Sequence, residues 1–242
     1  MSEFLLDAAR YVHISLGFVG LTAFWFPIFA KKGGRLHVTA GKVFKWCAYG
    51  VLGAAAAALS LRVTRLTLDG TTPFTDPGPY GFLIFLAYLT VVTFVTVRHG
   101  FTVLHNKRDH AALRHPLNYA LAWAAIASSA AIVAYALLIK PDTMIILLAL
   151  SPIGFLGGRG ILQFLANEPT TSRWWFYEHM GAMLGAGIAF HTAFFVFGST
   201  RLFEIGLTGW IAALPWIAPA AIGIPGSAIW ANYYRRRFGE AL

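Results

Sequence analysis

Histidine is the side chain best placed to do chemistry in this sequence, because several of its eight copies lie in or beside strongly apolar segments. An ionisable group near hydrocarbon is costly and is a sign of function. His13 and His191 lie toward one side of the expected membrane, whereas His37, His99 and His179 lie toward the other. Each ring needs a hydrogen-bond partner, water or a metal. These five histidines are therefore the first candidates for a site.

Haem binding is the first interpretation of these residues. Two histidines on different helices at one depth can hold a haem iron axially. We pair His13 with His191 for an outer site and His99 with His179 for an inner site, with His37 in reserve. The cofactor would be haem b, and the function electron transfer within the membrane. His179 and His191 are 12 residues apart, which is about 18 Å along a helix but about 120° around it, so one haem is easier to build than two.

A metal-dependent enzyme is the second interpretation. Glu178 is the only acidic residue inside an apolar segment, and it directly precedes His179. With His99, or with His37, these side chains offer the nitrogen and oxygen ligands of a catalytic zinc site. The sequence has no HExxH motif and no histidines four residues apart within a segment. The metal candidates His37 and Glu178 therefore depend on residue type alone.

The other histidines have a plainer interpretation. They are His105, His110 and His115, and they share a short stretch with Lys107, Arg108 and Arg114. Histidines at a membrane interface commonly hydrogen-bond carbonyls or lipid headgroups. We therefore expect these three in a solvated basic loop.

Seven apolar segments must position these side chains. The chain is 57% hydrophobic and only 12% charged, whereas about a quarter of a soluble domain is charged. Each segment is near the length that crosses a bilayer as a helix, the conformation that lipid requires. The sequence predicts one all-α, polytopic membrane bundle over residues 1–242. Its expected spans are 9–30, 40–61, 80–98, 116–139, 143–165, 174–198 and 207–233.

Three spans have unusual residues. Span 143–165 contains a Pro- and Gly-rich run, 151–160, so we expect its helix to break in the inner half, with Arg159 at the inner interface. Span 207–233 contains three prolines and is expected to kink. Broken helices also occur in carriers, which leaves a small carrier as a further alternative. In span 174–198, Gly181 and Gly185 predict close helix packing and a central position.

The distribution of basic residues predicts the orientation. One set of loops and helix ends holds 14 of the 19 lysines and arginines, which places the N-terminus outside and the C-terminus inside. The net charge of +9 then indicates contact with anionic headgroups at the inner face. No basic domain is available for nucleic acid, so nucleic acid is excluded as a partner. The first six residues lack a basic leader, so no cleavable signal peptide is expected.

Two stretches carry a resemblance. His13-Ile14-Ser15-Leu16-Gly17, followed by KKGGRLHVTAGK at 31–42, resembles the opening of an uncharacterised family of bacterial multi-span membrane proteins. That family shares a first-span histidine and an H-x-x-x-G turn before the second span. The resemblance implies a bacterial inner-membrane protein and supplies no activity. The layering of the histidines is also similar to that of cytochromes of the b561 type, although the 12-residue spacing departs from their pattern.

A non-catalytic role is the remaining alternative. Small-residue faces and exposed aromatic side chains suit an accessory or structural subunit of a larger membrane complex. The chain has no soluble domain to receive a substrate or an electron donor, which fits such a complex. Possible partners are therefore other membrane subunits as well as lipid.

Overall fold

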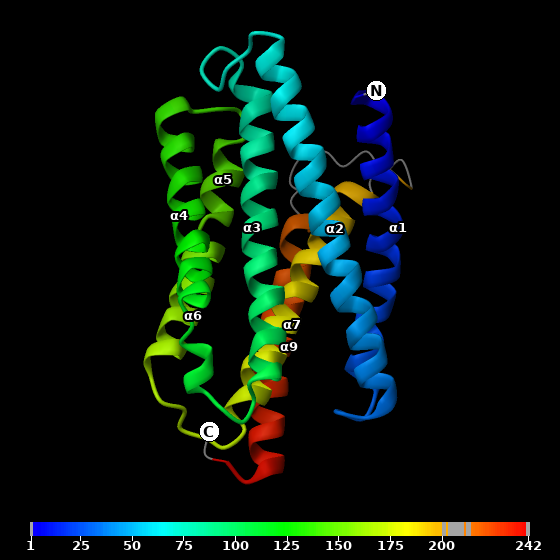
Figure 1. The fold of residues 1–242 in the computed structure, drawn as a ribbon, viewed down its shortest axis with the longest axis vertical. Helices are drawn as coiled ribbons and strands as arrows, with labels where there is room; N and C mark the ends of the chain where they lie inside the picture. The colour runs from blue at the N-terminus through cyan, green and yellow to red at the C-terminus, as the bar shows by residue number, and fades with distance from the viewer. Residues whose placement is uncertain (1, 200–201, 203–210, 212–213, 241–242) are drawn as a thin grey trace.

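The structure is a computed structural model that describes residues 2–199, 202, 211 and 214–240 (Figure 1). The described residues form helices and no strand. Seven of the helical stretches are long and apolar enough to span a membrane, which confirms the all-α polytopic bundle. The helices are α1 (Ser2–Phe29), α2 (Arg35–Leu68), α3 (Pro77–His105), α4 (Pro116–Ile139), α5 (Met144–Leu150), α6 (Pro152–Ala166), α7 (Trp174–Ala193) and α9 (Leu214–Phe238), with short turns η1 (Ala111–Leu113) and η2 (Phe194–Ser199).

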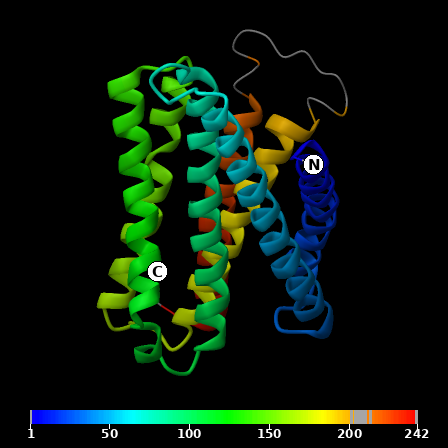
Figure 2. The same cartoon turned by 45° about the horizontal axis from the view of Figure 1, so that its top comes forward.

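Helix α3 joins the two halves of the bundle (Figures 1 and 2). On one side it packs against α4 and α6, and on the other against α2 and α7. Helices α1 and α2 form a hairpin at one edge, and α7 contacts α1, α3 and α9. The central position expected for the span 174–198 is thus found in α7.

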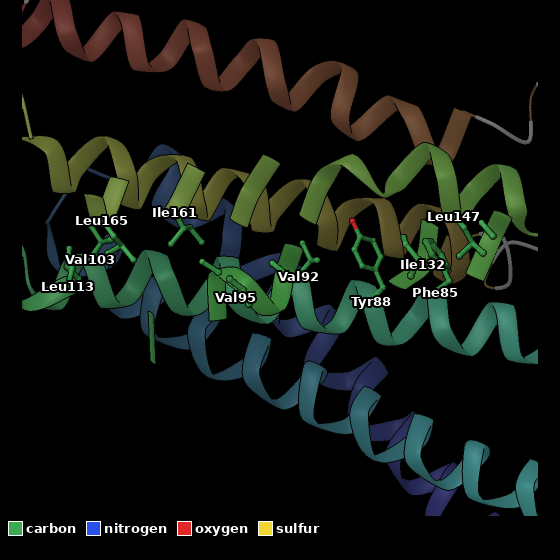
Figure 3. Packing of buried hydrophobic residues seen from close by; sticks show 13 residues of the cluster. Phe85, Tyr88, Val92, Val95, Val103, Leu113, Ile132, Leu147, Ile161 and Leu165 are labelled. Carbon is green, nitrogen blue, oxygen red and sulfur yellow. The ribbon is translucent and has the colours of Figure 1, made fainter. Parts of the chain in front are cut away.

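Two clusters of buried side chains hold this arrangement together. Figure 3 shows the first, between α3, α4, α5 and α6, in which Phe85 and Tyr88 are among the largest fully buried side chains. The second lies between α1, α2, α3 and α7 and includes Phe44, Val97 and Phe190. In lipid, such clusters stabilise the bundle through van der Waals contact.

The fifth span breaks at the first two residues of the predicted run 151–160, and the glycines after them do not interrupt it. Its helix is interrupted at Ser151–Pro152, and α6 then runs without interruption through the glycines and Arg159 to Ala166. Pro152 opens a helix easily because its missing N–H would have no partner in the first turn. The Tyr88 hydroxyl donates to the Leu150 carbonyl at 2.8 Å and accepts from the Gly154 amide at 3.0 Å. Tyr88 thereby satisfies backbone groups that lipid cannot.

The glycines of α7 do not contribute equally. A Cβ added at Gly181 would meet open space, and one at Gly185 would touch only the Thr96 methyl at 3.8 Å. The close approach is instead made from α3, where a Cβ on Gly100 would lie 2.8 Å from the Cβ of Ala182. The predicted packing face is therefore present, but Gly181 is not part of it.

Helix α9 covers the part of the last predicted span that the structure describes. It begins at Leu214, places Pro215 in its first turn and continues through Pro219 and Pro225. Residues 207–210, 212 and 213 of the predicted span lie outside the described residues. The expected kinks remain a prediction.

One end of the bundle gathers most of the basic residues, and we call it the basic end. It comprises the α1–α2 turn at 30–34, the connections 106–115 and 167–173, and the end of α9 at Phe238 (Figure 1). Its side chains include Lys31, Lys32, Arg35 and Arg173. Which side of the membrane this end faces remains a prediction.

Candidate functional site

Four of the candidate histidines share one hydrogen-bonding arrangement. In each ring Nδ1 contacts a backbone carbonyl oxygen: His13 with Val51 at 3.2 Å, His37 with Pro27 at 3.2 Å, His179 with Gly100 at 2.9 Å and His191 with Gly187 at 2.7 Å. A carbonyl can only accept, so Nδ1 carries the proton in a neutral ring. Nε2 then keeps its lone pair. Metal-binding histidines are commonly oriented in this way.

His99 and Glu178, which the zinc interpretation placed near each other, form a hydrogen-bonded pair. His99 Nε2 lies 2.9 Å from Glu178 Oε1, and the two side chains are 8% and 32% exposed. The other side of the His99 ring meets Phe164 edge-on, with 5.6 Å between ring centroids. The hydrogen bond to Glu178 occupies Nε2, the nitrogen that His99 would use as a ligand. The immediate role of the His99–Glu178 pair is thus to link α3 to α7.

The crossing of α3 and α7 carries two polar links side by side. His99 bonds Glu178, and the next residue of α3, Gly100, accepts from His179, the next residue of α7. The absence of a side chain at Gly100 permits this approach, because its carbonyl lies where the helices are closest. The His179 ring also packs against Phe101, with centroids 5.9 Å apart. His179 is therefore fixed in both position and tautomer.

The structure does not bring His13 and His191 together. The His191 ring packs edge-on against Phe24 and Trp25 of α1, each with centroids 5.4 Å apart. His13 lies 11 residues before Phe24 on the same helix, about 16 Å farther along the axis. The two rings therefore belong to different depths, and the outer pairing has no geometric support.

The inner pairing of His99 with His179 remains a prediction. His99 and His179 are linked through Glu178 and Gly100, not through contact between their rings. His37 lies in the first turn of α2 and His179 in the second turn of α7, both toward the basic end. We call His37 and His179 the inner histidine pair. His37 is bonded to α1 and His179 to α3.

Lys32 completes the surroundings of this pair. Its ammonium donates to the Pro27 carbonyl at 2.7 Å and the Ile28 carbonyl at 2.8 Å, and it lies 4.5 Å from the centroid of the Trp230 ring. Burial lowers the pKa of Lys32 below its ordinary value. Because Pro27 also accepts from His37, one carbonyl at the end of α1 positions both side chains. Sequence reasoning missed Lys32. The signal that could have identified it is its place about one turn after Pro27 and Ile28, from which a lysine can reach their carbonyls.

No larger metal-binding group is found in the described part of the chain. Within it, no three or more His, Cys, Asp and Glu side chains are arranged to hold a metal ion. Of the two metal candidates, Glu178 is bonded to His99 and His37 to the Pro27 carbonyl. A three-ligand zinc site therefore has no observation in its favour.

One expectation for the basic loop is wrong. His110 is buried, being 8% exposed, and is not solvated. Its Nε2 lies 3.0 Å from the Phe164 carbonyl, and its ring packs edge-on against Phe164 and Trp174. The aromatic side chains at the ends of α6 and α7 close over this ring. His105 and His115 are exposed as expected.

Comparison with models of known protein families, with curated proteins and with solved structures found no match to this chain.

Proposed function

We propose that this integral membrane protein binds one b-type haem through the inner histidine pair and takes part in electron transfer within the membrane. The supporting observation is that His37 and His179, on different helices at one end of the bundle, both bind backbone carbonyls through Nδ1. Both rings therefore offer Nε2 as an uncharged donor. Imidazole nitrogens of this kind are the usual axial ligands of such a haem.

The surroundings of the pair suit this role. Pro27 and Gly100, on different helices, hold the two rings through Nδ1 and leave both Nε2 atoms without a hydrogen-bonded partner in the described part of the chain. Phe101 packs against His179 and limits the access of water. A bound haem supplies reversible one-electron chemistry, and the protein sets its potential by ligation and burial. His99 and Glu178 act beside it by fixing α7 against α3.

The proposal extends to the setting of the protein. The resemblance of the first quarter of the chain to bacterial multi-span proteins supports a place in the bacterial inner membrane. Seven helices of spanning length support a multi-pass arrangement. The accessory-subunit alternative requires no cofactor, so the same experiment separates the two functions.

The experiment is an absorption spectrum of the protein expressed with added haem precursor and purified in detergent. We expect a Soret band that sharpens when dithionite reduces the iron. The His37→Ala and His179→Ala variants should each lose this band while eluting from size exclusion like the wild type. A colourless, well-folded wild type would overturn the proposal and favour the accessory subunit.

The matched control is His105→Ala. His105 is exposed near the same end of the bundle and should leave the band unchanged. The His13→Ala and His191→Ala variants should also keep it, because their rings lie away from the inner pair. If either of these two removes the band while His37→Ala retains it, the assignment of the ligands is wrong.

A further inference from the structure

A groove on the exposed side of α1 lies outside the haem proposal. Its volume is about 460 Å³, and it is formed by the last two turns of α1 and the start of α2, at the edge of the bundle (Figure 1). The side chains along it are mostly apolar and exposed, with Phe29 80% and Trp25 47% exposed. The lining residues are Thr22, Trp25, Phe26, Phe29, Ala30 and Leu36.

The groove has an ordered aromatic wall. The rings of Trp25 and Phe29, one turn apart, stack with 6.0 Å between centroids and 16° between planes. The Thr22 hydroxyl donates to the Phe18 carbonyl of its own helix, so it presents mainly its methyl group to the groove. The surface is therefore suited to an extended hydrocarbon chain.

Two unpaired cations stand at the end of this groove. Lys31 follows the lining residue Ala30, and Arg35 precedes the lining residue Leu36. Both are exposed, and neither makes a hydrogen bond or ion pair with any side chain in the described ranges. No acidic residue occurs in the sequence between Asp7 and Asp69. Among the described residues, no carboxylate forms an ion pair with either cation.

The structure of the turn directs these charges outward. Lys32, between them, turns inward to the carbonyls of α1. Gly34, the residue before α2, makes no side-chain cap, so the first amides of that helix also face the turn. Helix N-termini favour anions, which adds to the effect of the two cations.

We propose that this groove is a binding site for one anionic phospholipid of the bilayer. An acyl chain lies against Trp25 and Phe29, and the headgroup phosphate is bound by Lys31 and Arg35. An apolar groove that ends in two unpaired cations matches the two parts of such a lipid. Each basic residue near a membrane surface strengthens anionic lipid binding by about fivefold. The site does not depend on haem.

The experiment measures tryptophan quenching in vesicles that contain phospholipids with brominated acyl chains. The Trp25 signal is obtained as the difference between the wild type and Trp25→Phe. We expect brominated phosphatidylglycerol to quench Trp25 with an apparent affinity at least about fivefold above that of brominated phosphatidylcholine. The Lys31→Gln/Arg35→Gln variant should lose this preference and retain ordinary quenching by both lipids.

The control is Arg62→Gln/Lys140→Gln, which removes the same charge from exposed residues at the opposite end of the bundle. It should keep the preference of Trp25 for phosphatidylglycerol. Equal quenching of wild-type Trp25 by the two lipids would overturn the proposal. So would a preference that survives the Lys31/Arg35 change, or one that the control loses equally, since the effect would then be that of net charge.

Discussion

Two adjacent lysines at the α1–α2 turn show how position decides the role of a residue. Lys31 is exposed, and its side chain makes no hydrogen bond or ion pair with the residues that the structure describes. Lys32 donates to two carbonyls of the last turn of α1 and lies over Trp230 of α9. The last carbonyls of a helix have no partner within it, so a cation there satisfies and stabilises them.

We predict that Lys32→Met lowers the free energy of unfolding by roughly 1–3 kcal/mol, because it removes these charge-assisted bonds and a cation–π contact. Lys31→Met is the matched control and should change stability by less than about 0.5 kcal/mol. Unfolding of both variants in mixed detergent micelles measures the difference. Equal stabilities would show that Lys32 contributes nothing at the end of α1.

Sequence reasoning could locate the histidines but not their protonation. Apolar surroundings identify His179 as unusual from the sequence alone, whereas His37 lies beside Arg35 and Lys32 and could equally be an interfacial histidine. Their Nδ1 partners are the carbonyls of Pro27 and Gly100, which belong to other helices and carry no side-chain signature. The burial of His110 was missed for the same reason, since Phe164 and Trp174 reach it from different helices.

At the scale of elements, the α3–α7 crossing positions the site. A Cβ at Gly100 would lie 2.8 Å from Ala182 Cβ and 2.6 Å from Met183 Cε. Met183 has a flexible end that can move, but Ala182 cannot move without shifting its helix. Any side chain at residue 100 must therefore separate α3 from α7, and with them the His99–Glu178 and Gly100–His179 contacts.

We predict that Gly100→Ala lowers the free energy of unfolding by roughly 1–3 kcal/mol, as overpacking of a close contact does. It should also weaken haem retention, because His179 loses its carbonyl partner. Gly181→Ala is the control: its Cβ would meet open space, and in a helix alanine is intrinsically favoured over glycine. Unfolding curves and haem content measure both effects. If the Gly100→Ala protein were as stable as Gly181→Ala, the close contact of α3 and α7 at Gly100 would be contradicted.

The fifth span shows why glycine content predicts breaks poorly in a membrane bundle. Gly154 and Gly158 lie in continuous helix because α4 approaches them, with the Ala125 and Ala122 carbonyls 2.7 and 2.5 Å from where a Cβ would be. They serve packing, not flexibility. The break occurs at Pro152, where the lost hydrogen bond forces it. The backbone groups freed by the break hydrogen-bond to the Tyr88 hydroxyl, a partner on α3 that the sequence alone does not indicate.

At the scale of the whole molecule, the number and length of spans could be predicted from the sequence because bilayer thickness fixes them. Their lateral order could not. Except in α6, polar and apolar residues of the spanning helices are not separated onto opposite faces, so no stripe marks the face that meets a neighbour. Helix α3 joins the halves because Phe85, Tyr88 and Val97 fit two different clusters. Such fit depends on shape, which an apolar sequence does not reveal.

The charge asymmetry of the bundle leads to a last prediction, its orientation. The basic end should face the cytoplasm, because loops rich in lysine and arginine are retained there. The buried Cys47 is first replaced by alanine. Phe74→Cys, in the exposed loop at the opposite end, should then react with a membrane-impermeant maleimide in intact cells. Ala112→Cys, exposed at the basic end, should react only after lysis.

The reverse pattern would place the cations, and with them the inner histidine pair and the lipid groove, at the outer face. The placement of 14 basic residues on one side would then be explained by the ligands that they bind, and not by the retention of positive charge during membrane insertion.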